Sequence, residues 1–131
     1  MKERDLYPII EEVLSNSLSQ SALIEVKICK GHSLPFTALA PHQIRALKLC
    51  THSLIFKIPD GTFSQSPADM FYLHEARGWV CIVFYVPHRK KCLYLIDINT
   101  WVDNIVKSDR KSVTEDDCKR LAELFLDLNK L

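Results

Sequence analysis

Apolar residues near the start of the chain recur at the three- and four-residue spacing of one helix face. Asp5 offers a cap for this predicted helix, and Pro8 is tolerated in a first turn. From about residue 22 to residue 29 the pattern changes to alternation, which predicts a half-buried strand. The apolar positions that define the helix are Leu6, Ile9, Ile10, Val13 and Leu14.

Turn residues, helical spacing and strand alternation also predict the elements in the middle of the chain. The polar run 15–21 breaks the first helix, and residues 31–40 are predicted to form a loop. Pro41 suits the first position of a helix that continues to about Cys50. Four apolar runs predict strands, of which the last three should form an antiparallel meander. These strands are expected at 54–58, 70–73, 79–86 and 92–98.

Two further helices are predicted in the last third of the chain. Asn99 or Thr100 could cap the first of them. Thr114 and Asp117 have the spacing of a capping box, so the second is predicted to start there and to continue through Leu128. The alternation of helices and strands predicts one mixed α/β domain over the whole chain, with a central mixed sheet flanked by helices. Its core is expected to include Ile82, Phe84, Leu95, Leu121 and Phe125.

Composition narrows the function only slightly. A chain of 131 residues that is 47% hydrophobic suits one core rather than two domains. The apolar runs are too short to cross a bilayer, and the acidic N-terminal residues do not suit a signal peptide, so we expect no membrane partner and a cytoplasmic location. The five cysteines form no C-x-x-C pair, which favours reduced, buried thiols. The net charge of +1 means that affinity for nucleic acid would come from local basic clusters and bound cations.

The strand predicted at residues 22–29 carries two opposite charges on one face. Glu25 and Lys27 are two positions apart, and a strand points such residues the same way. In this arrangement the carboxylate could bind a divalent metal while the ammonium holds an attacking water. The same pattern also fits a half-buried strand with its charges in solvent, so the strand alone leaves both interpretations open.

The segments after this strand favour the interpretation in which Glu25 binds a metal and Lys27 holds a water. Residues 31–36 read Gly-His-Ser-Leu-Pro-Phe, and the next predicted helix begins Pro-His-Gln at residues 41–43. Over about residues 22–50 this order resembles the bacterial RecU-type and archaeal Holliday-junction resolvases of the PD-(D/E)XK nuclease superfamily. In that superfamily a Glu-x-Lys strand precedes a Leu/Pro-containing loop and a helix that starts near His-Gln.

The resemblance implies a restriction-endonuclease-like fold and a metal-dependent endonuclease that hydrolyses DNA phosphodiesters, with branched DNA as substrate. Glu25 matches the metal-binding carboxylate, Lys27 the catalytic lysine, and Gln43 the helix glutamine near the DNA backbone. Glu25 and the carbonyl of Val26 would help to hold Mg²⁺ or Mn²⁺. A chain of this size would suit a homodimer if two strands are cut symmetrically.

The sequence departs from the superfamily pattern at its aspartate. That residue normally lies on the strand before Glu-x-Lys, but the run 15–21 contains no acid. Asp69 follows Pro67 at the start of a predicted strand and resembles the Pro-Asp half of the signature, so it is the predicted second metal ligand. The resemblance leaves open a rearranged site that uses Asp69, an incomplete site, and an ordinary turn residue.

Weaker candidates complete the predicted site. Glu11 or Glu12 could add a carboxylate from the first helix, although solvated helix surface is the favoured interpretation of both. Without a complete site, the chain would be a catalytically inactive nuclease-fold module that binds nucleic acid or a protein partner. The cations predicted to contact phosphates are Arg45, Lys57, Arg89 and Lys90.

Overall fold

The central element of the structure is β5 (Arg77–Phe84), in which every residue from Gly78 onward is buried. Its sequence is almost continuously apolar, as expected for a strand that is covered on both faces. β5 pairs in parallel with β1 (Ala22–Cys29) and antiparallel with β6 (Cys92–Asp97), and β6 pairs antiparallel with β8 (Leu124–Asp127). The sheet is therefore mixed, with the strand order β1-β5-β6-β8.

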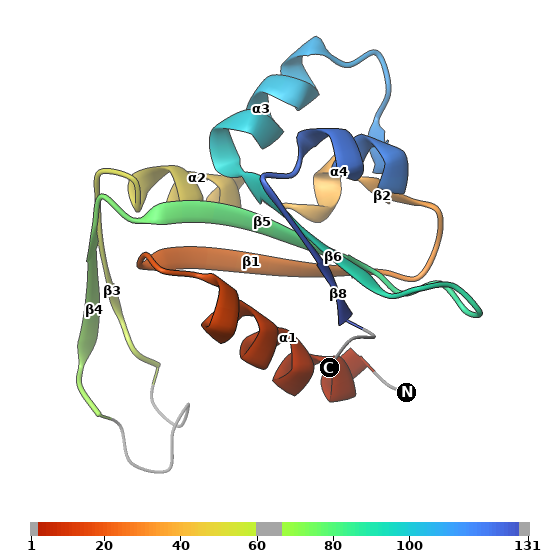
Figure 1. The fold of residues 1–131 in the computed structure, drawn as a ribbon. Helices are drawn as coiled ribbons and strands as arrows, with labels where there is room; N and C mark the ends of the chain where they lie inside the picture. Colours follow the sequence, from red (N-terminus) through yellow and green to blue (C-terminus); the bar gives the residue numbers. More distant parts are fainter. Residues whose placement is uncertain (1–2, 60–66, 129–131) are drawn as a thin grey trace.

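Helices cover both faces of this sheet in the computed structural model, which describes residues 3–59 and 67–128 (Figure 1). These helices are α1 (Glu3–Ser17), α2 (Pro41–Leu49), α3 (Ile98–Lys107) and α4 (Glu115–Leu121). α1 covers the face that carries Trp79, Cys81 and Val83, and the other three helices cover the opposite face. The predicted mixed α/β architecture, with a central mixed sheet flanked by helices, is confirmed.

α1 buries the apolar stripe that its sequence predicts. Leu6 and Ile10 are almost completely buried against the sheet, and the stripe continues along the helix. The helix begins at Glu3, so Asp5 lies inside it and the prediction of Asp5 as the cap is wrong. Among the helices of the described residues, none is long and apolar enough to cross a membrane.

Side-chain caps mark where α3 and α4 begin. The backbone N–H of Asn99 donates to Asp97 Oδ1 at 2.9 Å, so Asp97 caps α3 and the prediction of Asn99 or Thr100 is wrong. The predicted capping box of α4 is confirmed. The Asp117 N–H donates to Thr114 Oγ1 at 3.2 Å, and the Thr114 N–H donates to Asp117 Oδ2 at 2.9 Å. These bonds satisfy backbone donors that a helix start leaves unpaired.

The predicted antiparallel meander is wrong at its first step. β4 (Met70–His74) pairs antiparallel with β3 (Ser53–Lys57) in a separate two-stranded ladder and does not pair with β5. A strand has only two edges, and β1 and β6 already occupy both edges of β5. The chain turns between β4 and β5 at Glu75, which adopts a positive φ of 51°. Only the β5–β6 part of the meander is confirmed.

The predicted loop at residues 31–40 contains two short elements. β2 (Ser33–Pro35) pairs antiparallel with β7 (Ser112–Thr114), and η1 (Phe36–Ala38) is a 3-10 turn. Leu34 of β2 is buried in the core on the α2 side of the sheet. This small ladder therefore ties the segment after β1 to the start of α4.

The last predicted helix is wrong in its second half. α4 ends at Leu121, and residues 124–127 form β8 along the edge of β6. The backbone N–H of Glu123 donates to the Leu95 carbonyl oxygen at 2.9 Å, where the pairing starts. The sequence of this segment fits both periods, and the open edge of β6 selects the strand.

This change of element alters which predicted core residues are buried. Ile82, Phe84 and Leu95 lie in the core as predicted. Leu121 is partly buried and packs against the core, whereas Phe125 is 54% exposed, so the prediction of a core position is wrong for Phe125. In β8, alternate residues face solvent, whereas a continued helix would have turned Phe125 inward.

α2 approaches the sheet closely at Gly78 of β5. A Cβ atom at this position would collide with the backbone oxygen of Leu47 and would lie 3.1 Å from Cγ2 of Ile98. A backbone oxygen in a packed helix has little freedom to move aside. The absence of a side chain at Gly78 therefore allows α2 to sit at its observed distance from β5.

Replacing Gly78 with alanine should lower the free energy of unfolding by about 1–3 kcal/mol or more, because the added methyl group forces α2 outward. Gly31→Ala is the matched control, since a Cβ at Gly31 meets nothing within 4 Å. Its effect should stay within about 0.5 kcal/mol. Urea unfolding of both variants measures the difference, and equal effects would contradict the close approach of α2.

Two phenylalanines test the end of α4. Phe84→Ala should cost about 3–5 kcal/mol because Phe84 is fully buried. Phe125→Ala should lose mainly its ring contact with Tyr94, where the ring centroids are 5.3 Å apart, worth about 0.5–1.5 kcal/mol. Chemical denaturation measures both. Similar losses would indicate that residues 124–127 belong to a buried helix after all.

Candidate functional site

β1 carries different residues on its two faces and is the edge strand of the sheet. Within the described part of the chain it pairs only with β5, in a parallel register. Because neighbouring residues of a strand point to opposite faces, Glu25 and Lys27 project to the face that α2 covers. The residues of β1 that pack into the α1 layer are Ala22, Ile24, Val26 and Ile28.

The two charged side chains of β1 contact each other. Lys27 Nζ lies 3.3 Å from Glu25 Oε1, and the two side chains are only 23% and 31% exposed. Partial burial removes water from both charges, and each charge compensates the other. This outcome differs from the interpretation in which Glu25 and Lys27 are simply solvated, because both side chains lie half-buried and paired.

A cavity of about 250 Å³ adjoins this ion pair between β1, α2 and β3. We call it the β1–α2 cavity. Its polar members are Glu25, His42 and Gln43, and the last two come from the first turn of α2. Apolar side chains form the rest of its wall, namely Leu23, Ile24, Ala46, Leu47, Leu54 and Phe56. The structure therefore brings three residues of the predicted strand–loop–helix motif to one place.

Gln43 also has a structural role. Its side-chain Oε1 atom accepts a hydrogen bond from the backbone N–H of Ala40 at 2.9 Å. The backbone N–H of Gln43 donates to the Ala40 carbonyl oxygen at 3.0 Å. These two bonds close the first turn of α2, where Ala40 has no side-chain acceptor to do so. The Gln43 side chain is thereby held in the wall of the β1–α2 cavity.

Asp69 lies at the far end of the β3–β4 ladder. The near end is bound to the end of α2, where the Ala76 N–H donates to the Cys50 carbonyl oxygen at 2.9 Å. Asp69 is exposed, and its carbonyl oxygen accepts from the Ile58 N–H at 2.8 Å, beyond the last ladder pair. About 16 Å of strand separates it from His74 at 3.3 Å per residue. Figure 1 shows this ladder running away from α2 past the sheet.

The remaining predicted site residues do not line the β1–α2 cavity. Glu11 and Glu12 are exposed on α1, which covers the sheet face opposite to Glu25. Lys57 is exposed, and alternation along β3 points it away from Phe56 and the β1–α2 cavity. Arg45 on α2, and Arg89 and Lys90 between β5 and β6, are all exposed. Among the residues that the structure describes, no group of three or more His, Cys, Asp or Glu gathers as metal ligands do.

The apolar residues of the cavity wall were absent from the predicted site, Leu54 and Phe56 among them. Leu54 and Phe56 are alternate residues of β3, and this alternation could have shown that they share a face. It could not have shown that the face turns toward β1, because that depends on the ladder leaving the main sheet. The sequence therefore showed that Leu54 and Phe56 share one face of a strand, but it did not show that this face lies next to β1.

The cysteines lie where their apolar surroundings predict. All five are free and buried. Burial raises the pKa of the Cys81 thiol and of the Cys118 thiol to about 12, which keeps both protonated at neutral pH. A protonated buried thiol is a poor nucleophile and a poor metal ligand, so these cysteines act as small core residues.

No protein-family model, curated protein or solved structure matches this chain. The interpretation of the β1–α2 cavity therefore depends on the residues that form it and on their arrangement. The resemblance of residues 22–50 to the nuclease superfamily stays a prediction, as does the restriction-endonuclease-like fold.

A double-mutant cycle tests the ion pair of β1. Glu25→Gln and Lys27→Ala should each have modest effects on stability, and the double variant should reveal a coupling of about 1 kcal/mol. The expected cost of Lys27→Ala is far below that of Phe84→Ala, because it removes no core packing. Urea unfolding in low and high salt measures the coupling, which should weaken with salt. Strictly additive effects would show that the pair does not form in solution.

Proposed function

We propose that this chain is a metal-dependent endonuclease that hydrolyses DNA phosphodiesters, with branched DNA as its substrate. The observation that supports this most strongly is the half-buried Glu25–Lys27 pair on an edge strand, beside the first turn of α2. Desolvation offsets much of the attraction in such a pair, so stability alone gives little reason for placing two charges there. The proposal includes a restriction-endonuclease-like arrangement of the sheet.

The oxygen donors around Glu25 are of the kind that a hard divalent cation prefers. The Glu25 carboxylate and the Val26 carbonyl would hold Mg²⁺ or Mn²⁺ together with a substrate phosphate, since Mg²⁺ often takes only one or two carboxylates and keeps several waters. When bound, the cation would make a water more acidic and stabilise charge on the phosphate. Asp69 stays the predicted second carboxylate, and its place at the far end of the β3–β4 ladder calls for its own test.

Lys27 and Gln43 have separate parts in this proposal. The ammonium of Lys27 would donate to the attacking water or to a phosphate oxygen and so position the two reactants. The water oxygen would form a new bond to phosphorus while the bond from phosphorus to the leaving sugar oxygen breaks. The attacking water would release a proton to solvent, and the leaving oxygen would take up a proton from solvent. Gln43, held by its bonds to Ala40, would position the sugar-phosphate backbone at the β1–α2 cavity.

Exposed cations would supply most of the affinity for DNA. Arg45, Lys57, Arg89 and Lys90 are proposed to contact phosphates, which orient a duplex without reading its bases. Selection of substrate would then depend on the shape of the nucleic acid and not on its sequence. A homodimer would provide two such surfaces for a symmetric cut.

A second candidate is a catalytically inactive module that binds nucleic acid or a protein partner. The position of Asp69 favours it, because the ladder places this residue at the end remote from α2. The engagement of Gln43 Oε1 in closing the first turn of α2 also fits a structural role. Both candidates use the same face of β1, and only catalysis separates them.

Cleavage of branched and linear duplex DNA with Mg²⁺ or Mn²⁺ tests the proposal. Wild type should cut, and Glu25→Gln and Lys27→Ala should each lower the rate about 100-fold or more, as removal of one group that stabilises developing charge does in other enzymes. Asp69→Asn should lower the rate to a similar extent only if Asp69 holds the metal. Thermal melting should show that the variants are folded.

Matched controls are available on other surfaces of the chain. Glu12→Gln removes a carboxylate from the α1 side of the sheet, and Lys48→Ala removes an exposed cation from the last turn of α2. Both should retain wild-type rates. If wild type binds DNA but cuts no substrate with either metal, the inactive module replaces the endonuclease. If the controls lose as much activity as Glu25→Gln, the active site does not lie on β1.

A further inference from the structure

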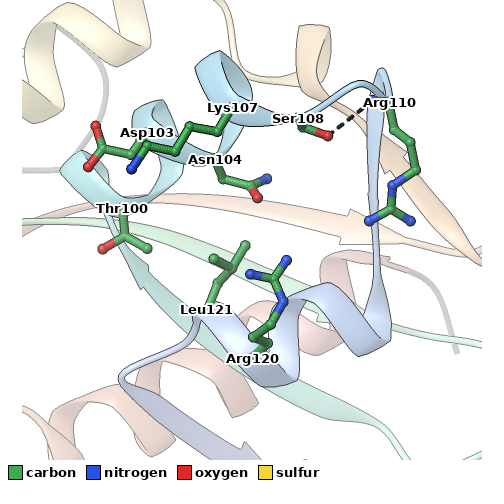
Figure 2. A pocket seen from close by; sticks show the side chains of 8 residues that line it. All are labelled: Thr100, Asp103, Asn104, Lys107, Ser108, Arg110, Arg120 and Leu121. Atoms are coloured by element: carbon green, nitrogen blue, oxygen red, sulfur yellow. Dashed lines mark hydrogen bonds between the residues drawn. The ribbon is translucent and has the colours of Figure 1, made fainter.

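A second cavity, of about 420 Å³, lies between α3, the segment after it and α4 (Figure 2). We call it the α3–α4 cavity. Its wall consists of Thr100, Asp103, Asn104, Lys107, Ser108, Arg110, Arg120 and Leu121. None of these residues lines the β1–α2 cavity. Its chemistry is also different, because charged, amide and hydroxyl side chains form most of its wall, whereas the wall of the first cavity is mostly apolar.

One buried carboxylate holds two arginines at this cavity. Asp117 Oδ1 lies 2.7 Å from Nη2 of Arg110 and 3.5 Å from Nη2 of Arg120, and Asp117 itself is 8% exposed. Burial acts to raise the pKa of Asp117, but hydrogen bonds from Thr114 and Arg110 outweigh it and lower that pKa to about 2. Asp117 is therefore ionised at neutral pH and keeps both guanidinium groups near each other.

The arginines carry more charge than this carboxylate neutralises. Two guanidinium groups share one aspartate, and their side chains are 59% and 62% exposed, so many of their N–H donors stay available to a ligand. Figure 2 shows the Arg120 guanidinium and the Asn104 amide directed toward the space between α3 and α4, and the Arg110 guanidinium directed toward the start of α4. Lys107 lies along α3 on the side of Asp103, outside this group.

These donors favour one ligand chemistry. Guanidinium groups form paired, charge-assisted hydrogen bonds with phosphate oxygens, and an amide can add a further donor. The C-terminal end of α3 carries partial negative charge and gives an anion no help. Attraction at this site therefore comes from Arg110 and Arg120, which makes it sensitive to the loss of either.

We propose that the α3–α4 cavity binds a phosphate group between Arg110 and Arg120, independently of the site on β1. The group belongs either to a free phosphomonoester or to a phosphodiester of nucleic acid. The two guanidinium charges suit the dianion of a monoester best. Asp117 acts as a positioning residue that holds the two arginines and does not contact the ligand.

Titration with inorganic phosphate, followed by NMR of the wild-type chain, tests the site. The side-chain amide signals of Asn104 should shift and saturate. Arg120→Gln should weaken binding about tenfold, the loss expected for one charge-assisted contact, and Arg120→Lys should restore part of it. Arg120 is exposed and is the more distant partner of Asp117, so Arg120→Gln should remain folded.

Lys119→Gln is the matched control, because Lys119 is the neighbouring exposed cation on α4 and lies outside the α3–α4 cavity. It should bind phosphate like wild type. Parallel titrations use a nucleoside monophosphate and a short oligonucleotide without terminal phosphates, and the tighter Arg120-dependent ligand identifies the source. Glu25→Gln should bind phosphate normally, which separates this site from the endonuclease proposal. Absence of saturable binding to wild type, or equal weakening by Lys119→Gln, would overturn the proposal.

Discussion

The burial of β5 is the constraint on which the rest of the structure depends. Its side chains are covered by α1 on one face and by the other helices on the opposite face, and its two edges are covered by β1 and β6. With no polar side chain after Arg77 to place in solvent, the strand is stable only when it is surrounded in this way. The close approach of α2 at Gly78 is part of this covering.

This arrangement has a direct consequence for β1. As the neighbour of a fully enclosed strand, β1 also has both faces at least partly covered, so Glu25 and Lys27 do not extend freely into water. They are half-buried and contact each other, and Glu25 lines the β1–α2 cavity together with Gln43. Desolvation offsets part of the attraction within such a pair, so the pair adds little net stability.

The two cavities lie on the same side of the sheet but differ in the chemistry of their walls. The β1–α2 cavity is mostly apolar and has one carboxylate, whereas the α3–α4 cavity is lined by arginines that a buried aspartate holds in place. Their residues come from different helices. Binding of a ligand at β1 and binding of a phosphate between α3 and α4 would therefore be independent, unless one ligand is long enough to reach both sites.

Features that depend on residues close together in the chain could be predicted from the sequence, since both the spacing of apolar residues and helix capping are local. The stripe of α1, the alternation of β1 and the capping box at Thr114 all form as predicted, and Glu25 and Lys27 share one face of β1 as predicted. Tertiary structure decided which strand edges were free. Because β1 and β6 fill both edges of β5, β4 pairs with β3 and carries Asp69 away from α2. Because β6 keeps an open edge, residues 124–127 become a strand and Phe125 turns outward, an outcome that depends on partners distant in sequence.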